Sequence, residues 1–196
     1  LNGIEESDYF RTHPVTSERV RFLEQAVKQS PYHQDHSLDS EFQRIKAKLY
    51  GFLQEPAQTF KRYPPSDTSI AARYAQAIAY FKQLNFGKAL RMIDVLSAEE
   101  PDNPYFYELK AQIYMEQGNL KAAKEAYGKV LKLRPDAALL QVDWAQAALA
   151  VSPSPAELKN IIAVLNRSLQ QRPSAIGWLL LSQAYDQNGQ TAYAEY

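Results

Sequence analysis

Three histidines are the first residues to consider for chemistry in this chain of 196 residues, which contains no cysteine. His33 and His36 lie three residues apart, a spacing that can hold a metal ion when both lie on one helix. They follow Pro31 and stand among charged and polar residues, which favours a solvated connector. The sequence contains no HExxH motif and no glycine-rich phosphate loop. We therefore predict no complete active site: this chain itself should not be an enzyme and should need no cofactor.

Charge and hydropathy limit the partners that the chain can have. Its 22 basic and 22 acidic residues are mixed along the sequence, so no basic stripe is present to hold a phosphate backbone. Nucleic acid is not an expected partner. No apolar run approaches the roughly 18 residues of a membrane span, and the first residues do not resemble a signal peptide. The chain begins without methionine and stops within a helical pattern, so we expect it to be a piece of a longer protein.

Like residues recur at a fixed interval in the middle of the chain. Four pairs are separated by 34 residues: Ala77 and Ala111, Tyr80 and Tyr114, Ala89 and Ala123, Pro101 and Pro135. The alanines of each unit allow two antiparallel helices to approach closely, the tyrosine fills the remaining space, and the proline ends the second helix. This order resembles the tetratricopeptide repeat. The resemblance implies an all-α fold in which helical hairpins form a right-handed superhelix.

The repeats are assigned to residues 70–196, with three full units followed by a truncated one; their bounds are 70–103, 104–137, 138–174 and 175–196. Turns between the two helices of a unit are predicted at 84–86 and 118–120, where Gly118 can take a positive φ. The last unit lacks most of its second helix, so Trp178, Leu181 and Tyr185 should be unusually exposed or buried in an intermolecular contact.

Two further helices are predicted ahead of the repeats. Residues 38–69 are interpreted as a degenerate repeat or cap, whose first helix, 38–53, has Phe42, Ile45, Leu49 and Phe52 on one side. Residues 15–29 form another expected helix, with Val20, Leu23 and Val27 along one stripe.

The repeat resemblance also implies where a ligand would bind. In tetratricopeptide arrays the first helices of successive units line a concave groove. At these positions we expect a mostly apolar groove that binds the apolar side chains of a partner peptide. The predicted partner-binding residues are Tyr74, Ile78, Phe81, Tyr105, Met115, Leu139 and Val142. In the fourth unit they are Ile176, Leu179, Gln183 and Asp186. Tyr74 and Ile78 replace the lysine and asparagine of the family's carboxylate clamp, so an acidic C-terminus is not the expected ligand. Packing against a neighbouring domain or another helix of the same polypeptide is an equal alternative.

A short motif near the N-terminus points to a particular parent protein. The stretch Thr12-His13-Pro14, with Arg19 five residues after the proline, resembles a segment of bacterial zinc metallopeptidases of the BepA/YfgC type, which carry tetratricopeptide repeats after it. Residues 42–53 also look like their intervening helix. The resemblance implies that residues 1–37 are the tail end of the catalytic-domain region with a linking helix. It also implies a zinc-containing HExxH domain upstream and a periplasmic location. Unfolded envelope proteins, or the parent's own catalytic domain, would then be the partners.

Within such a parent, His13 would be the one residue of this chain close to the chemistry. It could act as a regulatory zinc ligand that blocks the open metal position, or donate a hydrogen bond to the oxyanion. An ordinary pre-proline loop residue is the simpler interpretation. Two functions therefore remain: an interaction and regulatory module of a zinc-dependent metallopeptidase, or a stand-alone tetratricopeptide scaffold or adaptor with no protease attached.

Overall fold

A computed structural model describes residues 16–31 and 38–190 of the chain. Within these two ranges the regular structure consists of ten α-helices, and no strand occurs in them. This confirms the all-α prediction. The chain divides into two compact units, residues 1–42 and 43–196. His13, His33 and His36 lie outside the described residues, so the interpretations given to them are not addressed by the structure.

The first unit contains helix α2 (Thr16–Gln29). The apolar stripe expected on this helix is exposed, since Val20, Leu23 and Val27 all face solvent, as does Phe22. Helix α3 (Asp39–Leu53) begins in this unit and continues into the second.

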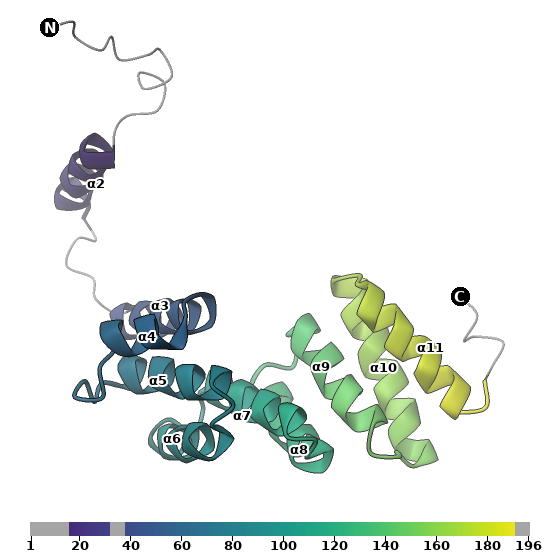
Figure 1. Ribbon diagram of the computed structural model, residues 1–196. Coiled ribbons are helices and arrows are strands. Elements are labelled where there is room, and N and C mark those ends of the chain that lie inside the picture. Colours follow the sequence, from purple (N-terminus) through teal and green to yellow (C-terminus); the bar gives the residue numbers. More distant parts are fainter. Residues whose placement is uncertain (1–15, 32–37, 191–196) are drawn as a thin grey trace, which may run out of the picture. The chain divides into compact units, whose positions relative to one another are not determined.

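Three antiparallel helical hairpins and one further helix form the body of the second unit (Figure 1). The helices are α5 (Ile70–Lys82), α6 (Phe86–Glu99), α7 (Pro104–Glu116), α8 (Leu120–Leu133), α9 (Ala138–Leu149), α10 (Pro155–Gln171) and α11 (Ala175–Gln187). The most extensive contacts lie within the hairpins α5/α6 and α7/α8. Ala77 and Ala89 are fully buried in one core cluster, and Ala111 and Ala123 in another. The small repeated residues therefore lie where helices meet, as the repeat predicted.

The turns inside the hairpins α5/α6 and α7/α8 share one backbone design. The side chains of Asn85 and Asn119 cap the second helices. Each side-chain oxygen accepts a hydrogen bond from the backbone N–H three residues later, that of Lys88 or of Ala122. The residue before each asparagine has a left-handed backbone: Leu84 has φ 59° and Gly118 has φ 71°. In both turns the asparagine N–H donates to a carbonyl five residues back, which closes a Schellman motif. The first turn thus places a branched residue where the second has glycine.

Leu84 should therefore carry backbone strain that glycine would relieve. A left-handed backbone at a non-glycine residue destabilises the fold by about 1 to 2 kcal/mol. Glycine removes this strain, but its greater freedom in the unfolded chain offsets part of the gain in stability. We expect Leu84→Gly to raise the free energy of unfolding by about 0.5 to 1 kcal/mol in urea denaturation. Leu84→Ala keeps the strained φ and serves as the control, and a gain equal to that of glycine in this control would contradict the explanation.

The last helix only partly matches the expectation for a truncated repeat. Trp178 is 52% exposed, as predicted for a side chain without its covering helix. Leu181, in contrast, is 5% exposed, and Tyr185 is half-buried against the same core cluster as Leu165 of α10. The prediction for Leu181 was wrong because the preceding hairpin covers it without help from a further helix.

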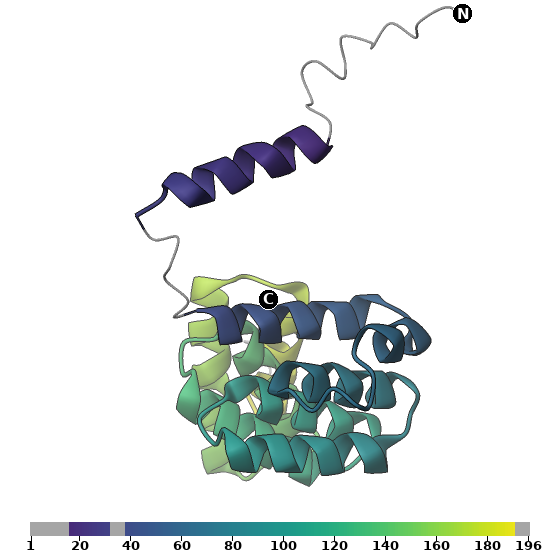
Figure 2. The same cartoon turned by 90° about the vertical axis from the view of Figure 1, so that its left-hand side faces the viewer.

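Helix α3 and the short helix α4 (Pro56–Arg62) precede the hairpins, and both views place α3 beside α5 (Figures 1 and 2). Of the four apolar residues expected on one side of α3, only Phe52 packs on the repeat core. Phe42, Ile45 and Leu49 are exposed. The buried side of α3 is instead made of the small residues Ala47 and Gly51. Small side chains allow the backbone of α3 to approach α5 more closely than the apolar side would.

Candidate functional site

Several of the first-helix positions expected to line a groove are more accessible towards the C-terminal end of the repeats, although Val142 and Leu149 on α9 are buried. Tyr74 of α5 is 1% exposed and Ile78 is fully buried. Tyr105 and Glu108 of α7 are half-buried. Leu139 of α9 is 51% exposed, and Ile176 and Leu179 of α11 are similarly open. Equivalent positions of a repeat therefore differ in whether a partner could reach them.

The first-helix positions on α5 are poorly accessible because helix α3 packs against this helix. A Cβ atom on Gly51 would lie only 3.0 Å from Cγ2 of Ile78, so the two helices touch there. Further along, the Lys48 Nζ donates to Glu108 Oε2 over 2.6 Å. The same ammonium lies 5.0 Å from the centre of the Tyr105 ring, a cation–π distance. Helix α3 thus occupies the first-helix side of α5 and α7.

Charged side chains bind α3 to the repeats at two further points. Arg44 forms an ion pair with Glu100 at 3.2 Å. At the C-terminal end of α3, the Lys82 Nζ donates to the backbone carbonyls of Phe52 and Gln54, at 2.9 and 2.6 Å. Those carbonyls have no partner within the helix, so a lysine there both caps α3 and complements its dipole.

The accessible end consists of one side of α9 and one side of α11. On α9, Leu139, Asp143 and Gln146 follow the spacing of a single helical stripe, and Leu139 and Gln146 are exposed. Ile176, Leu179 and Gln183 form the matching exposed stripe on α11, which contacts α9 directly. We call these six residues the α9/α11 face.

The structure divides the residues predicted to bind a partner into three groups. Leu139 is exposed; Phe81, Tyr105 and Met115 are half-buried; Tyr74, Ile78 and Val142 are buried. Ile78 lies against Gly51 of α3, Tyr74 packs against Phe106 of α7, and Val142 packs into the core shared with Leu165 and Leu181. All three side chains are covered by core packing in this structure.

Asp143 is a residue of this face that the sequence reasoning missed. Its position one turn after Leu139 was the available signal. The carboxylate is half-buried and has no hydrogen-bond or ion-pair partner among the described residues. Burial, and secondarily the negative charge of Glu108, raise the pKa of Asp143 to about 6. The chain therefore keeps an uncompensated carboxylate beside an apolar, exposed surface.

Removing this charge should stabilise the protein in a pH-dependent way. The folded pKa of about 6 exceeds the unfolded value of about 3.9, so ionisation of Asp143 destabilises the native state as pH rises through this interval. We expect Asp143→Asn to raise the free energy of unfolding at pH 7.5 by about 1 to 2 kcal/mol, less than the full shift because the group is partly solvated. Most of the gain should disappear at pH 4. Urea denaturation at both pH values tests this, with the exposed Asp136→Asn as control.

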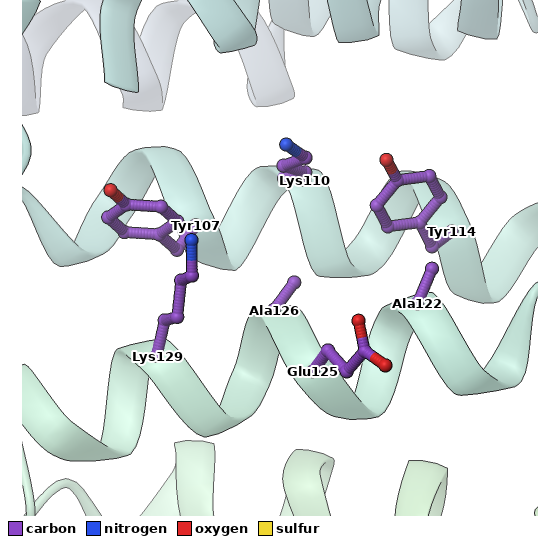
Figure 3. Close-up of a pocket in the computed structure, with 7 residues that line it drawn as sticks. All are labelled: Tyr107, Lys110, Tyr114, Ala122, Glu125, Ala126 and Lys129. Atoms are coloured by element: carbon purple, nitrogen blue, oxygen red, sulfur yellow. The ribbon is translucent and has the colours of Figure 1, made fainter. Parts of the chain in front are cut away.

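A separate small pocket lies on the hairpin α7/α8, lined by Tyr107, Lys110, Tyr114, Ala122, Glu125, Ala126 and Lys129 (Figure 3). Both of its lysines are already engaged. Lys110 pairs with Asp94 at 2.6 Å, and the Lys129 Nζ lies 5.2 Å from the centre of the Tyr107 ring. The seven lining residues offer neither a nucleophile with an adjacent base nor a set of metal ligands.

Two other kinds of feature are absent from the described part of the chain. Residues 16–31 and 38–190 contain no group of three or more histidine or acidic side chains placed to hold a metal ion. None of the helices in these ranges combines the length and apolar character needed to cross a membrane.

Comparisons with known proteins identify the repeat class. The family model of the tetratricopeptide repeat matches residues 74–138 and 109–152, so this region consists of tetratricopeptide repeats. Two similar solved structures are designated MamA MSR-1 and MamA AMB-1, with TM-scores of 0.61 and 0.62. They share 15% and 16% sequence identity with this chain; the matches cover 80% and 81% of it, and 91% and 87% of those chains. These likenesses establish the fold alone. No curated protein matches the sequence.

Proposed function

We propose that this chain is a protein-binding module whose partner docks on the α9/α11 face. A tetratricopeptide fold is a scaffold for protein–protein interaction, and this role follows from the repeats. The choice of surface rests on one observation: Leu139 and Gln146 on α9 and Ile176, Leu179 and Gln183 on α11 are exposed, whereas Tyr74 and Ile78 on α5 are buried. Exposed Leu139, Ile176 and Leu179 are the kind of apolar side chains that mark an interaction site.

Site-specific photo-crosslinking can test the surface before the partner has been identified. A photoreactive amino acid is placed at Leu139 or Leu179 of the full-length protein in its native cells. Val95 on α6, which is 51% exposed, provides a matched aliphatic control outside the face. We expect a discrete protein adduct from the two face positions and none from Val95. Equal adducts from all three positions, or none from the face, would overturn the proposal.

The same face can be tested by substitution once an adduct has been found. Leu139→Glu with Leu179→Glu should abolish the adduct formed from a probe at Ile176, because burying a carboxylate against an apolar partner costs several kcal/mol. The control Val95→Glu should leave that adduct unchanged. Both variants should keep the native melting temperature within a few degrees, since these side chains are exposed.

We further propose that the module belongs to a zinc-dependent metallopeptidase of the BepA/YfgC type. The support is the Thr12-His13-Pro14 stretch, which lies outside the described residues, together with its order ahead of α3 and the repeats. Zinc, a periplasmic location and unfolded envelope proteins as clients are parts of this proposal. The alternative is a stand-alone scaffold that carries no protease.

Measurements on the full-length natural protein separate the two. The metallopeptidase proposal expects stoichiometric zinc and proteolysis that stops with a chelator; absence of both supports the scaffold. If His13 blocks the zinc, His13→Ala should raise basal proteolysis, and if it stabilises the oxyanion, the same change should lower the rate roughly a hundredfold. Unchanged activity and zinc content would remove both roles from His13.

A further inference from the structure

We infer that the partner of the α9/α11 face is an amphipathic helix that places a lysine or arginine on Asp143 and aliphatic side chains on Leu139, Ile176 and Leu179. This inference rests on the proposed function and adds the chemistry of the partner.

Charge supplies the first argument. The sequences of α9 and α11 contain no lysine or arginine, and their only charged residues are Asp143 and Asp186. The group that acts electrostatically on Asp143 is the carboxylate of Glu108 on α7, and the charge of Asp143 in turn acts on the hydroxyl of Tyr127 on α8. Glu108 is already neutralised by Lys48 of α3. Asp143 is a half-buried carboxylate without a cation among the described residues, so a basic side chain from outside is its natural complement.

The position of α3 on the repeats shows how a helical partner can bind to this side of the first helices. Helix α3 is already a helix that lies on the first-helix side of α5 and α7 and presents a lysine to them. Its Lys48 meets Glu108, while Ala47 and Gly51 provide the close contact. Leu139 occupies on α9 the repeat position of Tyr105 on α7, whereas the position of Glu108 is taken by the buried Val142 and Asp143 follows it by one residue. A helical partner on α9 and α11 would therefore lie on the same first-helix side as α3, with its basic residue placed for a carboxylate one position further along the helix.

Asp143 lowers the stability of the free protein. Its half-buried and uncompensated carboxylate does nothing for the hairpins, since no described residue donates to it. Groups retained at the expense of stability are frequent at binding sites. A partner's ammonium or guanidinium would convert this unfavourable group into a charge-assisted hydrogen bond.

Synthetic helical peptides provide the probe. The reference peptide is a stapled amphipathic helix with leucines at i, i+3 and i+7 and one lysine at i+4. Two matched peptides carry norleucine or glutamate in place of that lysine. Fluorescence anisotropy against the full chain should show the lysine peptide binding at least about tenfold more tightly than the norleucine peptide, as expected for one hydrogen bond to a charged group. The glutamate peptide should bind most weakly.

Variants of the protein identify the group responsible. Asp143→Asn should abolish the preference for lysine and leave the affinity for the norleucine peptide unchanged, whereas Asp186→Asn should keep the preference. The preference should also be present at pH 7.5 and lost at pH 5, where Asp143 is protonated in the free protein. A lysine preference that survives Asp143→Asn, or that depends on Asp186, would overturn the inference.

The two proposals fail in different ways. If Leu139→Glu with Leu179→Glu weakens every peptide but lysine and norleucine bind equally, the face binds protein and only the basic partner is refuted. If that variant affects no peptide, the proposed surface itself is wrong. Analytical ultracentrifugation of the chain alone tests whether a second copy of the chain binds to the α9/α11 face. A dimer that dissociates in the Leu179→Glu variant would show that a second copy, rather than a basic helix, occupies this face.

Discussion

Replacing Gly51 by leucine is expected to lower the free energy of unfolding by about 1 to 3 kcal/mol and to lift α3 from the first helices. A Cβ atom at this position would lie 3.0 to 3.3 Å from three carbon atoms of the Ile78 side chain. Ile78 is fully buried and cannot turn away without disturbing the core around Tyr74 and Phe106. Leucine also has a better helix propensity than glycine by roughly 1 kcal/mol, so a net loss requires overpacking to dominate.

Two readouts follow the fate of α3 in this variant. Urea denaturation measures the loss of stability. Trypsin cleavage after Arg44 and Lys48, both held in ion pairs in the native protein, measures the release of the helix. Leu49→Gln changes the exposed side of α3 and should alter stability by no more than about 0.5 kcal/mol. Combining Gly51→Leu with Ile78→Ala should be less destabilising than the sum of the two changes, since each relieves the other. A stable, protease-resistant Gly51→Leu protein would contradict the close approach of α3 and α5.

The second large effect is expected from Ala111→Leu, which tests the register of the repeats. Ala111 is fully buried in one cluster with Ala123 and Tyr127, where α7 meets α8. A leucine there would separate the two helices, at a cost of about 1 to 3 kcal/mol. Ala98 on α6 is exposed and offers the same substitution without the contact. We expect Ala98→Leu to be neutral in thermal unfolding, while Ala111→Leu lowers the melting temperature by several degrees. A thermally neutral Ala111→Leu protein would mean that the helices do not meet at this residue.

The sequence was a good guide wherever contacts are local. The hairpins join segments a few residues apart, and their alanines, asparagine caps and prolines repeat every 34 residues. Each helix needs only its neighbours to bury its apolar side. The fold class and the location of the hairpins therefore followed from periodicity, while the turns at Leu84 and Ser152 place a residue other than glycine at positive φ.

The role of α3 could not be predicted in this way. Its apolar stripe, including Phe42 and Leu49, suggested which side would pack, yet the buried side carries Ala47 and Gly51. The ion pair of Lys48 joins residues 60 positions apart. Such a contact leaves no periodic trace in the sequence, because it depends on where two distant helices come together.

The binding site shows the same division between local and distant information. Repeat positions alone determined which residues could line a groove, since the helical period puts them on one side of each first helix. Only the tertiary structure decided which of them are accessible: Tyr74 and Ile78 are buried, the latter against α3, whereas Leu139, Ile176 and Leu179 are open. It also revealed Asp143, whose significance depends on burial and on the charge of Glu108 in another repeat. Accessibility and electrostatic environment are sums over all neighbours in space, while periodicity records only the neighbours along the chain.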